Sequence, residues 1–256
     1  MMIKKFTTTL MIMIFVFGAM INTQAQDEKK EYQMWESIML TPVNSKLKTL
    51  QDNMRKHNKT YHKEGAYEAA VYNIVSGPNS GNLIWEMGPL MFSHLDGRPA
   101  EGGHDEDWRD NVMPYIKKMH TIEYWRDMEK LSNTSMMIGD NSEYPILYLR
   151  YFEVNSGHGY TVQPLLKKMR EAVKAMESGA PWGLYSNEFR QGKDIGRHIA
   201  WVAFYKNWTE FDNDDASFKD AYLKVHGDNS WDSYIRGLDD TFSNSWDEIW
   251  VYDKNM

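Results

Sequence analysis

The sequence of 256 residues contains no cysteine. This absence excludes disulfide bonds, thiolate metal ligands and cysteine nucleophiles, because each of them needs a thiol. The fold must therefore rest on its hydrophobic core, and a chain of this length can build one. Positive charge is also scarce, since the formal net charge is −7. General nucleic-acid binding needs a basic face, so we expect no nucleic-acid partner.

Long apolar runs are scarce too, and the one candidate lies at the N-terminus. Residues 10–21 form an apolar run that follows Lys4 and Lys5 and precedes small residues ending at Ala25. About 20 apolar residues are needed to cross a bilayer, so the run is short for a membrane anchor. The whole pattern is typical of a secretory signal peptide. We predict a signal peptide over residues 1–25 and a secreted or periplasmic mature chain with no membrane association.

Several motifs of known enzyme classes are missing as well. The sequence has no His-Glu-x-x-His zinc helix and no Gly-x-Ser-x-Gly nucleophile turn. Two Gly-x-x-x-Gly elements begin at Gly77 and Gly192, and each leads into a strand-like run. A phosphate-binding loop opens a helix instead, so neither element indicates a nucleotide site.

What the sequence does contain is an internal repeat. The tripeptide that begins at Val43 recurs at Val154, 111 residues later, and the Gly-x-x-x-Gly element recurs 115 residues later. A third match, which begins at Gly65 and again at Gly179, lies between them at an offset of 114 residues. The shared order and slowly drifting offset indicate a duplicated unit.

Each copy has the same predicted order of elements: strand, helix, strand, strand, helix, strand. In the second copy, apolar residues from Val162 to Met176 recur every three or four positions, which predicts an amphipathic helix. The second helix of the first copy is predicted over residues 106–119, and its counterpart is predicted to break near residues 226–228. This order is that of the ferredoxin-like βαββαβ unit. Two such units bury their open sheet faces when sheet packs against sheet.

With this topology, repeat spacing and length, the chain resembles the dimeric α/β-barrel superfamily in a tandem, single-chain form. The resemblance covers nearly the whole mature chain, with one unit at residues 26–135 and the other at 144–256. The superfamily includes NIPSNAP-like proteins, monooxygenases, haem-degrading enzymes and chlorite-dismutase-like haem proteins. The resemblance implies an α+β fold whose barrel can hold a small organic molecule or haem.

A stretch rich in glycine and carboxylates, residues 92–108, is the first candidate site. His94 and Asp96 would share one face of an extended strand, and the glycines that follow would let His104 fold back toward them. The hypothesis is a metal site formed by His94, Asp96 and His104. The alternative is a polar connection in which the acidic residues 105–107 begin a helix and offset its dipole.

Charged residues on predicted strands suggest a second candidate site, inside the barrel. Alternation puts Ile146, Tyr148, Arg150 and Phe152 on one face of a strand and Leu184, Ser186, Glu188 and Arg190 on one face of another. We expect these faces to point inward, where buried charges must be paired or face a ligand. One interpretation is an anionic ligand held by arginine, with aromatic walls. The residues are Trp85, Tyr148, Arg150, Glu188 and Arg190. The alternative is an ion-pair network or an exposed barrel mouth.

Two histidines are candidates for haem. The resemblance to chlorite-dismutase-like proteins implies a haem ligand on a helix of the C-terminal unit, where His226 lies. His158 lies in a loop after a predicted strand, and such loops often carry function. The alternatives are a capping histidine and an ordinary loop histidine.

The function that we predict is that of an exported small-molecule-binding protein, with oxidative chemistry on an aromatic substrate as its enzymatic form. A haem-binding enzyme or carrier is the second hypothesis, and a non-catalytic structural or interaction protein is the third. The 10 Trp, 15 Tyr and 10 Phe residues suit either a packed core or a cavity lined by rings. The cofactor, haem or a metal ion, and the oligomeric state are left open.

Overall fold

The computed structural model describes residues 31–98, 102–134, 137, 141–176, 181–189, 197–212 and 217–256. Residues Tyr32–Met256 form one compact unit. The predicted signal peptide at residues 1–25 lies outside the described residues, so export stays a prediction. Within the described ranges, no helix is both long and apolar enough to span a membrane.

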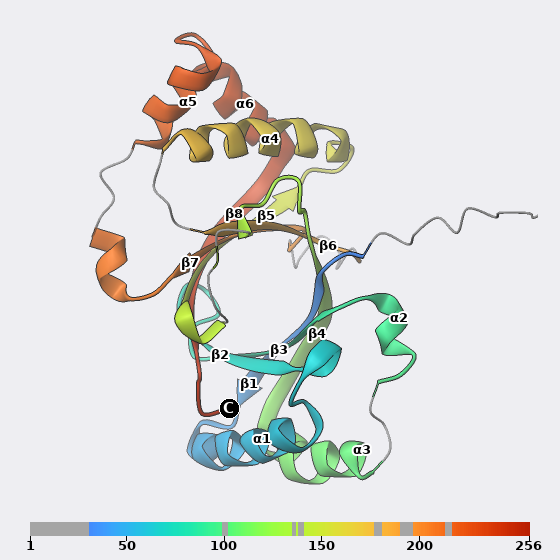
Figure 1. The fold of residues 1–256 in the computed structure, drawn as a ribbon. Helices are drawn as coiled ribbons and strands as arrows, with labels where there is room; N and C mark the ends of the chain where they lie inside the picture. Colours follow the sequence, from blue (N-terminus) through green and yellow to red (C-terminus); the bar gives the residue numbers. More distant parts are fainter. Residues whose placement is uncertain are drawn as a thin grey trace, which may run out of the picture. The chain divides into compact units, whose positions relative to one another are not determined.

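Eight strands form a closed barrel at the centre of this unit (Figure 1). Their order around the barrel is β1-β3-β2-β8-β5-β7-β6-β4, and neighbouring strands pair antiparallel. The strands are β1 (Met34–Pro42), β2 (Ala69–Ser76), β3 (Leu83–Leu90), β4 (Ile116–Asp127), β5 (Ile146–Val154), β6 (Trp182–Asn187), β7 (Ile199–Tyr205) and β8 (Phe242–Tyr252).

The barrel consists of two four-stranded halves with the same internal order. The N-terminal half supplies β4-β1-β3-β2, and the C-terminal half supplies β8-β5-β7-β6. Pairing of β2 with β8 and of β4 with β6 joins the halves at both edges. This order is that of the βαββαβ unit, and closure leaves no open sheet edge. The fold class predicted from the sequence is confirmed, whereas the division at residues 26–135 and 144–256 stays a prediction.

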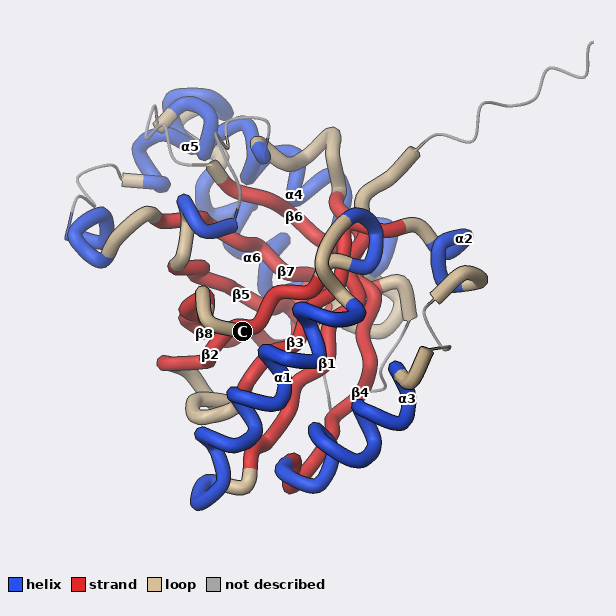
Figure 2. The backbone as a smooth tube through the Cα atoms, turned by 60° about the horizontal axis from the view of Figure 1, so that its bottom comes forward, coloured by secondary structure: helices blue, strands red, loops and turns tan. Residues whose placement is uncertain are grey.

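Helices cover the outside of the barrel on two sides (Figures 1 and 2). One side carries α1 and α3, and the other carries α4, α5 and α6. The helices are α1 (Leu47–Tyr61), α2 (Phe92–Leu95), α3 (His104–Asp107), α4 (Gly159–Ala175), α5 (Phe218–His226) and α6 (Trp231–Thr241). On α1, Leu50 and Met54 lie one turn apart and are fully buried, which is the spacing that turns one helical face toward a sheet.

The strand faces are arranged opposite to the prediction. Leu147, Leu149 and Tyr151 of β5 belong to the cluster of buried side chains that lines the inside of the barrel. Phe152 belongs to the cluster that includes the buried face of α4. The prediction that residues 146, 148, 150 and 152 face inward is therefore wrong. Both faces of β5 are largely buried and both carry apolar residues, so alternation alone does not distinguish them.

Helix boundaries in the second half of each unit follow proline and glycine. The helix predicted over residues 106–119 is shorter, because α3 passes into a π-helical turn at Trp108–Val112 and β4 begins two residues after Pro114. Proline has no N–H for the helical hydrogen bond. The break predicted near residues 226–228 is confirmed, since Gly227 follows α5 with a φ of +93°.

Candidate metal centre

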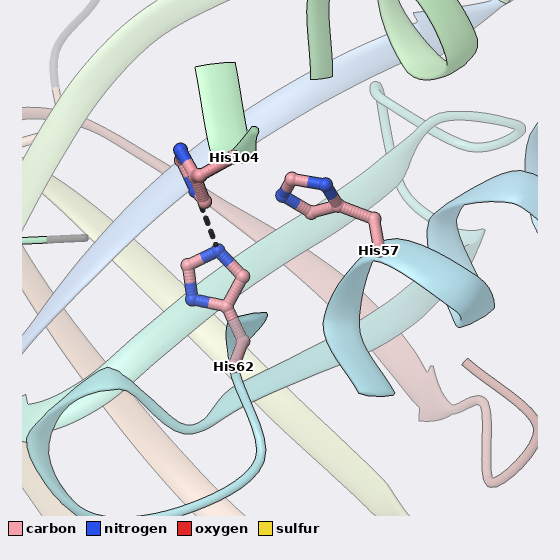
Figure 3. A group of neighbouring side chains, drawn as sticks. All are labelled: His57, His62 and His104. Carbon is pink, nitrogen blue, oxygen red and sulfur yellow. Dashed lines mark hydrogen bonds between the residues drawn. The ribbon is translucent and has the colours of Figure 1, made fainter. Parts of the chain in front are cut away.

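Three histidines meet between α1, the segment that follows it, and α3 (Figure 3). His57 lies in the second half of α1, His62 directly follows the helix, and His104 is the first residue of α3. One ring nitrogen from each histidine lies within 4.8 Å of the other two. Residues 57 and 104 are far apart in sequence, so the packing of α3 against α1 creates the cluster.

Each of the three rings is held by an acceptor at its Nδ1 atom. The acceptor for His57 is Oδ2 of Asp107 at 2.8 Å, and that for His104 is Oδ1 of Asp105 at 2.7 Å. His62 has the backbone carbonyl of Tyr67 at 2.9 Å. Carbonyls and ionised carboxylates only accept hydrogen bonds, so Nδ1 carries the proton in each ring. The Nε2 atom is then left with a lone pair, as in histidines that bind metals with their outer nitrogen anchored.

The Nε2 lone pairs have few other protein partners. Nε2 of His62 lies 3.1 Å from Nε2 of His104, and Figure 3 shows the His57 ring beside this pair. Nε2 of His57 is buried without a hydrogen-bond partner among the described residues. Three imidazoles around a tetrahedral zinc ion at about 2.0–2.1 Å have nitrogens about 3.3 Å apart. The pair at 3.1 Å is close to that separation, and a ring nitrogen of His57 lies within 4.8 Å of the other two.

Burial keeps two of the rings neutral. It lowers the pKa of His57, an effect that the hydrogen bond donated by His57 to Asp107 opposes. Burial also lowers the pKa of His62 to about 4. Because His62 is neutral near pH 7, its Nε2 atom carries a lone pair. This lone pair faces Nε2 of His104, whose Nδ1 atom is likewise held by a hydrogen bond. Two lone pairs at this distance repel each other unless a cation or an extra proton lies between them.

Aromatic side chains surround the cluster. The ring centroids of His57 and Trp108 lie 5.1 Å apart. Those of His62 and Trp85 also lie 5.1 Å apart, in an edge-to-face contact. Tyr61 contacts both His57 and His104. His57 and His62 are buried, whereas the His104 side chain keeps 12% of its surface exposed. Among the three rings, that of His104 is therefore the one that solvent reaches.

A buried amide fixes the helix that carries His57. Asn58 accepts a hydrogen bond from Nε1 of Trp85 at 3.0 Å and donates one to the backbone oxygen of Met256 at 3.2 Å. It thereby ties α1 to β3 and to the last residue of the chain. The position of the His57 ring is set by these contacts as well as by Asp107.

Only one member of the predicted metal site belongs to this cluster. His104 is part of it, whereas His94 and Asp96 are not. The short helix α2 places His94 within a helical turn and not on an extended strand, and its Nδ1 atom accepts a hydrogen bond from the Met91 amide at 3.0 Å. The prediction that His94 and Asp96 share a strand face is wrong, because the strand ends at Leu90.

Sequence reasoning missed His57 and His62. A spacing of five residues puts two side chains on different faces of a continuous helix. The helix ends at Tyr61, so the chain turns at His62 and brings its ring back to that of His57. The end of the helix was the signal that would have identified the pair.

Of the residues predicted for an anionic ligand, the four that the structure describes lie outside the barrel, where they contact other protein groups. Arg150 donates two hydrogen bonds to Asp247, at 2.7 and 2.8 Å, and one to the Tyr148 hydroxyl at 2.8 Å. Glu188 forms an ion pair with Arg126 at 2.6 Å. Trp85 packs against His62 on the outer face of β3. Arg190 lies outside the described residues. The ion-pair network, which was the alternative, matches this arrangement.

The two haem candidates do not lie together in one site. Nε2 of His226 lies 3.0 Å from the Lys168 carbonyl, so this nitrogen donates a hydrogen bond and is not free to bind iron. His158 precedes α4 and borders a groove between α4 and α6 with a volume of about 380 Å³. His226 is not among the residues that line this groove.

Comparison with known proteins bears on the fold. No family profile and no curated protein matches the sequence. An anthrone oxidase-like protein of known structure is 10% identical, with a TM-score of 0.56, over 88% of this chain and 92% of that chain. A candidate monooxygenase from Lactobacillus acidophilus is 12% identical, with a TM-score of 0.52, over 88% and 95%. The chain has the dimeric α/β-barrel fold.

A candidate chlorite dismutase gives the same result, with 7% identity and a TM-score of 0.51 over 88% of this chain and 96% of that chain. The predicted resemblance to the superfamily is confirmed at the level of fold. At these identities the likeness carries no information about residues, and unrelated functions share this kind of fold.

Proposed function

We propose that this protein binds a divalent transition-metal ion, with Zn²⁺ as the first candidate, at His57, His62 and His104. The observation that carries the proposal is the meeting of two Nε2 atoms at 3.1 Å beside a third that is buried and unpartnered within the described residues. Neutral imidazole suits zinc, copper, iron and nickel. Three protein ligands leave the fourth position of a tetrahedral zinc ion for water or an external ligand.

The surroundings favour a reactive site over a purely structural one. Structural zinc sites are closed by four protein ligands, whereas this cluster has three within the described residues. The exposed edge of His104 is where an external ligand would enter. Burial of His57 and His62 disfavours the protonated imidazolium form, so their Nε2 atoms carry no proton at neutral pH.

The first test is calorimetric titration of chelator-treated, full-length protein with Zn²⁺. We expect one ion per chain, and we expect His62→Ala to weaken binding by more than about 100-fold, because loss of an outer partner alone costs about 10–100-fold. His94→Ala is the matched control, since His94 is a nearby histidine outside the cluster. If His62→Ala does not fold, the Zn²⁺ affinity of a His104→Gln variant is measured instead, because His104 is partly exposed.

Equal affinity in wild type, His62→Ala and His104→Gln would overturn the proposal, as would the absence of a stoichiometric binding event. Loss of binding in His94→Ala alone would instead support the metal site predicted from the sequence, which consists of His94, Asp96 and His104.

Oxidative chemistry on an aromatic substrate is the second candidate function. It is favoured by the rings of Tyr61, Trp85 and Trp108 around the cluster and by the suitability of imidazole for iron and copper. The fold is compatible with small-molecule binding. Anaerobic loading with Fe²⁺, followed by oxygen-uptake measurements with and without a phenol, tests this function. Uptake that does not depend on His62 would exclude the centre as its site.

A further inference from the structure

A second group of unpartnered polar atoms lies inside the barrel, on the opposite face of β3 from the metal centre. Ser37 of β1 is the direct cross-strand neighbour of Glu86 of β3. Ile84 belongs to the cluster inside the barrel, so Glu86, two residues later on the same strand, also faces inward. Trp35 and Met39 pack against the same cluster, which places Ser37 on the inner face of β1.

Neither polar group has a protein partner within the described residues. The Ser37 hydroxyl is buried, with 1% of the residue exposed, and makes no hydrogen bond. No hydrogen bond or ion pair to Glu86 is formed by any described residue, and burial raises the pKa of its carboxyl to about 7. Buried polar groups are normally paired, and an unpaired one costs free energy. The Ser37 hydroxyl is such a buried group, and the half-buried carboxyl of Glu86 beside it has no protein partner among the described residues either. The pair indicates that their partner comes from outside the described chain.

The charge inside the barrel favours a cationic partner. Among the described residues, the inward-facing arginine is Arg197, and it is already engaged. Its Nε donates to Glu123 at 3.0 Å, its Nη2 donates to the Tyr151 hydroxyl at 3.0 Å, and its Nη1 lies 3.8 Å from Glu248. The guanidinium of Arg197 thus faces the carboxylates of Glu123 and Glu248. Glu86 adds a third carboxyl group to the inside of the barrel. Nη1 of Arg197 makes no hydrogen bond, but the carboxylates around this guanidinium outnumber it, so an anionic guest would meet an excess of negative charge.

The walls beside these groups are aromatic. Trp35 packs edge-on against Tyr185 with ring centroids 5.5 Å apart, and the ring centroids of Tyr72 and Tyr252 lie 5.7 Å apart. Burial and then the charge of Glu86 raise the pKa of Tyr72, so this ring lies near the carboxyl. Trp35 and Glu86 each keep part of their surface accessible although they face inward. Aromatic faces attract ammonium groups through their quadrupoles, most strongly where water is excluded.

We propose that the barrel interior beside Glu86 and Ser37 binds a small organic amine, with its ammonium group paired to Glu86 and its apolar body against the aromatic rings. The Ser37 hydroxyl accepts a hydrogen bond from the same ammonium group. This site is independent of the metal centre, because the sheet separates Glu86 on the inner face of β3 from Trp85 on the outer face.

The experiment compares three probes of similar size: phenethylamine, 2-phenylethanol and 3-phenylpropanoate. Binding to full-length protein is followed by tryptophan fluorescence and calorimetry at about pH 8, where a carboxyl with a pKa of about 7 is ionised. We expect phenethylamine to bind at least about tenfold more tightly than the alcohol and the carboxylate to bind most weakly, as the charge balance requires.

The variant Glu86→Gln removes the charge and keeps the shape of the side chain. We expect it to abolish the preference for the amine over the alcohol and to leave Zn²⁺ binding at the histidines unchanged. Glu68→Gln is the matched control, because Glu68 is exposed, and it should behave as wild type. Equal binding of amine and alcohol, amine preference that survives in Glu86→Gln, or no binding of phenethylamine at millimolar concentration would each overturn the proposal.

Discussion

Each histidine of the metal centre has one ring nitrogen fixed by a neighbour and one that points toward the other rings. The acceptors at Nδ1 are Asp107, Asp105 and the Tyr67 carbonyl. They set the tautomer of His57, His104 and His62, and they also fix how each ring is turned. At this scale the centre depends as much on these acceptors as on the histidines themselves.

The buried His62 ring makes the stability of the metal-free protein depend on pH. Its pKa is about 4 when folded and about 6.5 when unfolded, so the unfolded chain binds more protons between these values. Stability is complete above pH 6.5 and falls as the pH falls toward 4. From pH 7 to pH 5 we expect His62 to account for a loss of about 2 kcal/mol. Urea unfolding of wild type and His62→Gln in EDTA measures this difference.

The control for the pH effect is His226→Gln, which should lose as much stability as wild type. An acid-induced loss of the same size in His62→Gln and in wild type would contradict the assignment of His62 as a neutral buried ring.

At the scale of elements, the centre joins a long helix to a very short one. α1 has 15 residues and a buried apolar face, whereas α3 has four residues and contributes none that are buried. Gly103 precedes α3 with a φ of +88°, a conformation that glycine adopts readily. Because α3 has little core of its own, its position depends on its side-chain contacts, among them the pair of Asp107 with His57.

A bound metal should therefore stabilise α3 more than any other helix. We expect Zn²⁺ to slow amide hydrogen exchange in residues 104–112, because a ligand that binds the folded form suppresses local opening. Exchange in α5 should not change, since it lies on the other side of the barrel. Hydrogen-exchange mass spectrometry with and without Zn²⁺ measures both segments. The same slowing in a His104→Gln variant would contradict the link between metal and helix.

At the scale of the whole molecule, the fold was more predictable than the site. The offset of 111–115 residues between repeated motifs predicted two units with the same order of elements. The strand order of the barrel shows two four-stranded halves with the same internal order. The inner and outer faces were not predictable, because strands such as β5 are apolar on both faces. Glu86, flanked by Trp85 and Met87 on a largely buried strand, is recognisable as an interior charge only after the barrel is closed.

The metal centre shows the same limit. His104 was found because it lies in a short segment crowded with possible ligands. His57 and His62 were missed because their convergence depends on where α1 ends and on how α3 packs against it. The end of a helix has a local sequence signal, whereas the packing of α3 against α1 has none.

The most direct test of the metal centre is zinc K-edge X-ray absorption of the protein loaded with one equivalent of Zn²⁺. We predict three imidazole nitrogens at about 2.0 Å, with the oxygen of a water molecule completing the shell. In His62→Ala the spectrum should lose one imidazole and gain oxygen scattering. A shell made mainly of oxygen in the wild-type protein, or a spectrum that does not change in the variant, would contradict the three-histidine centre.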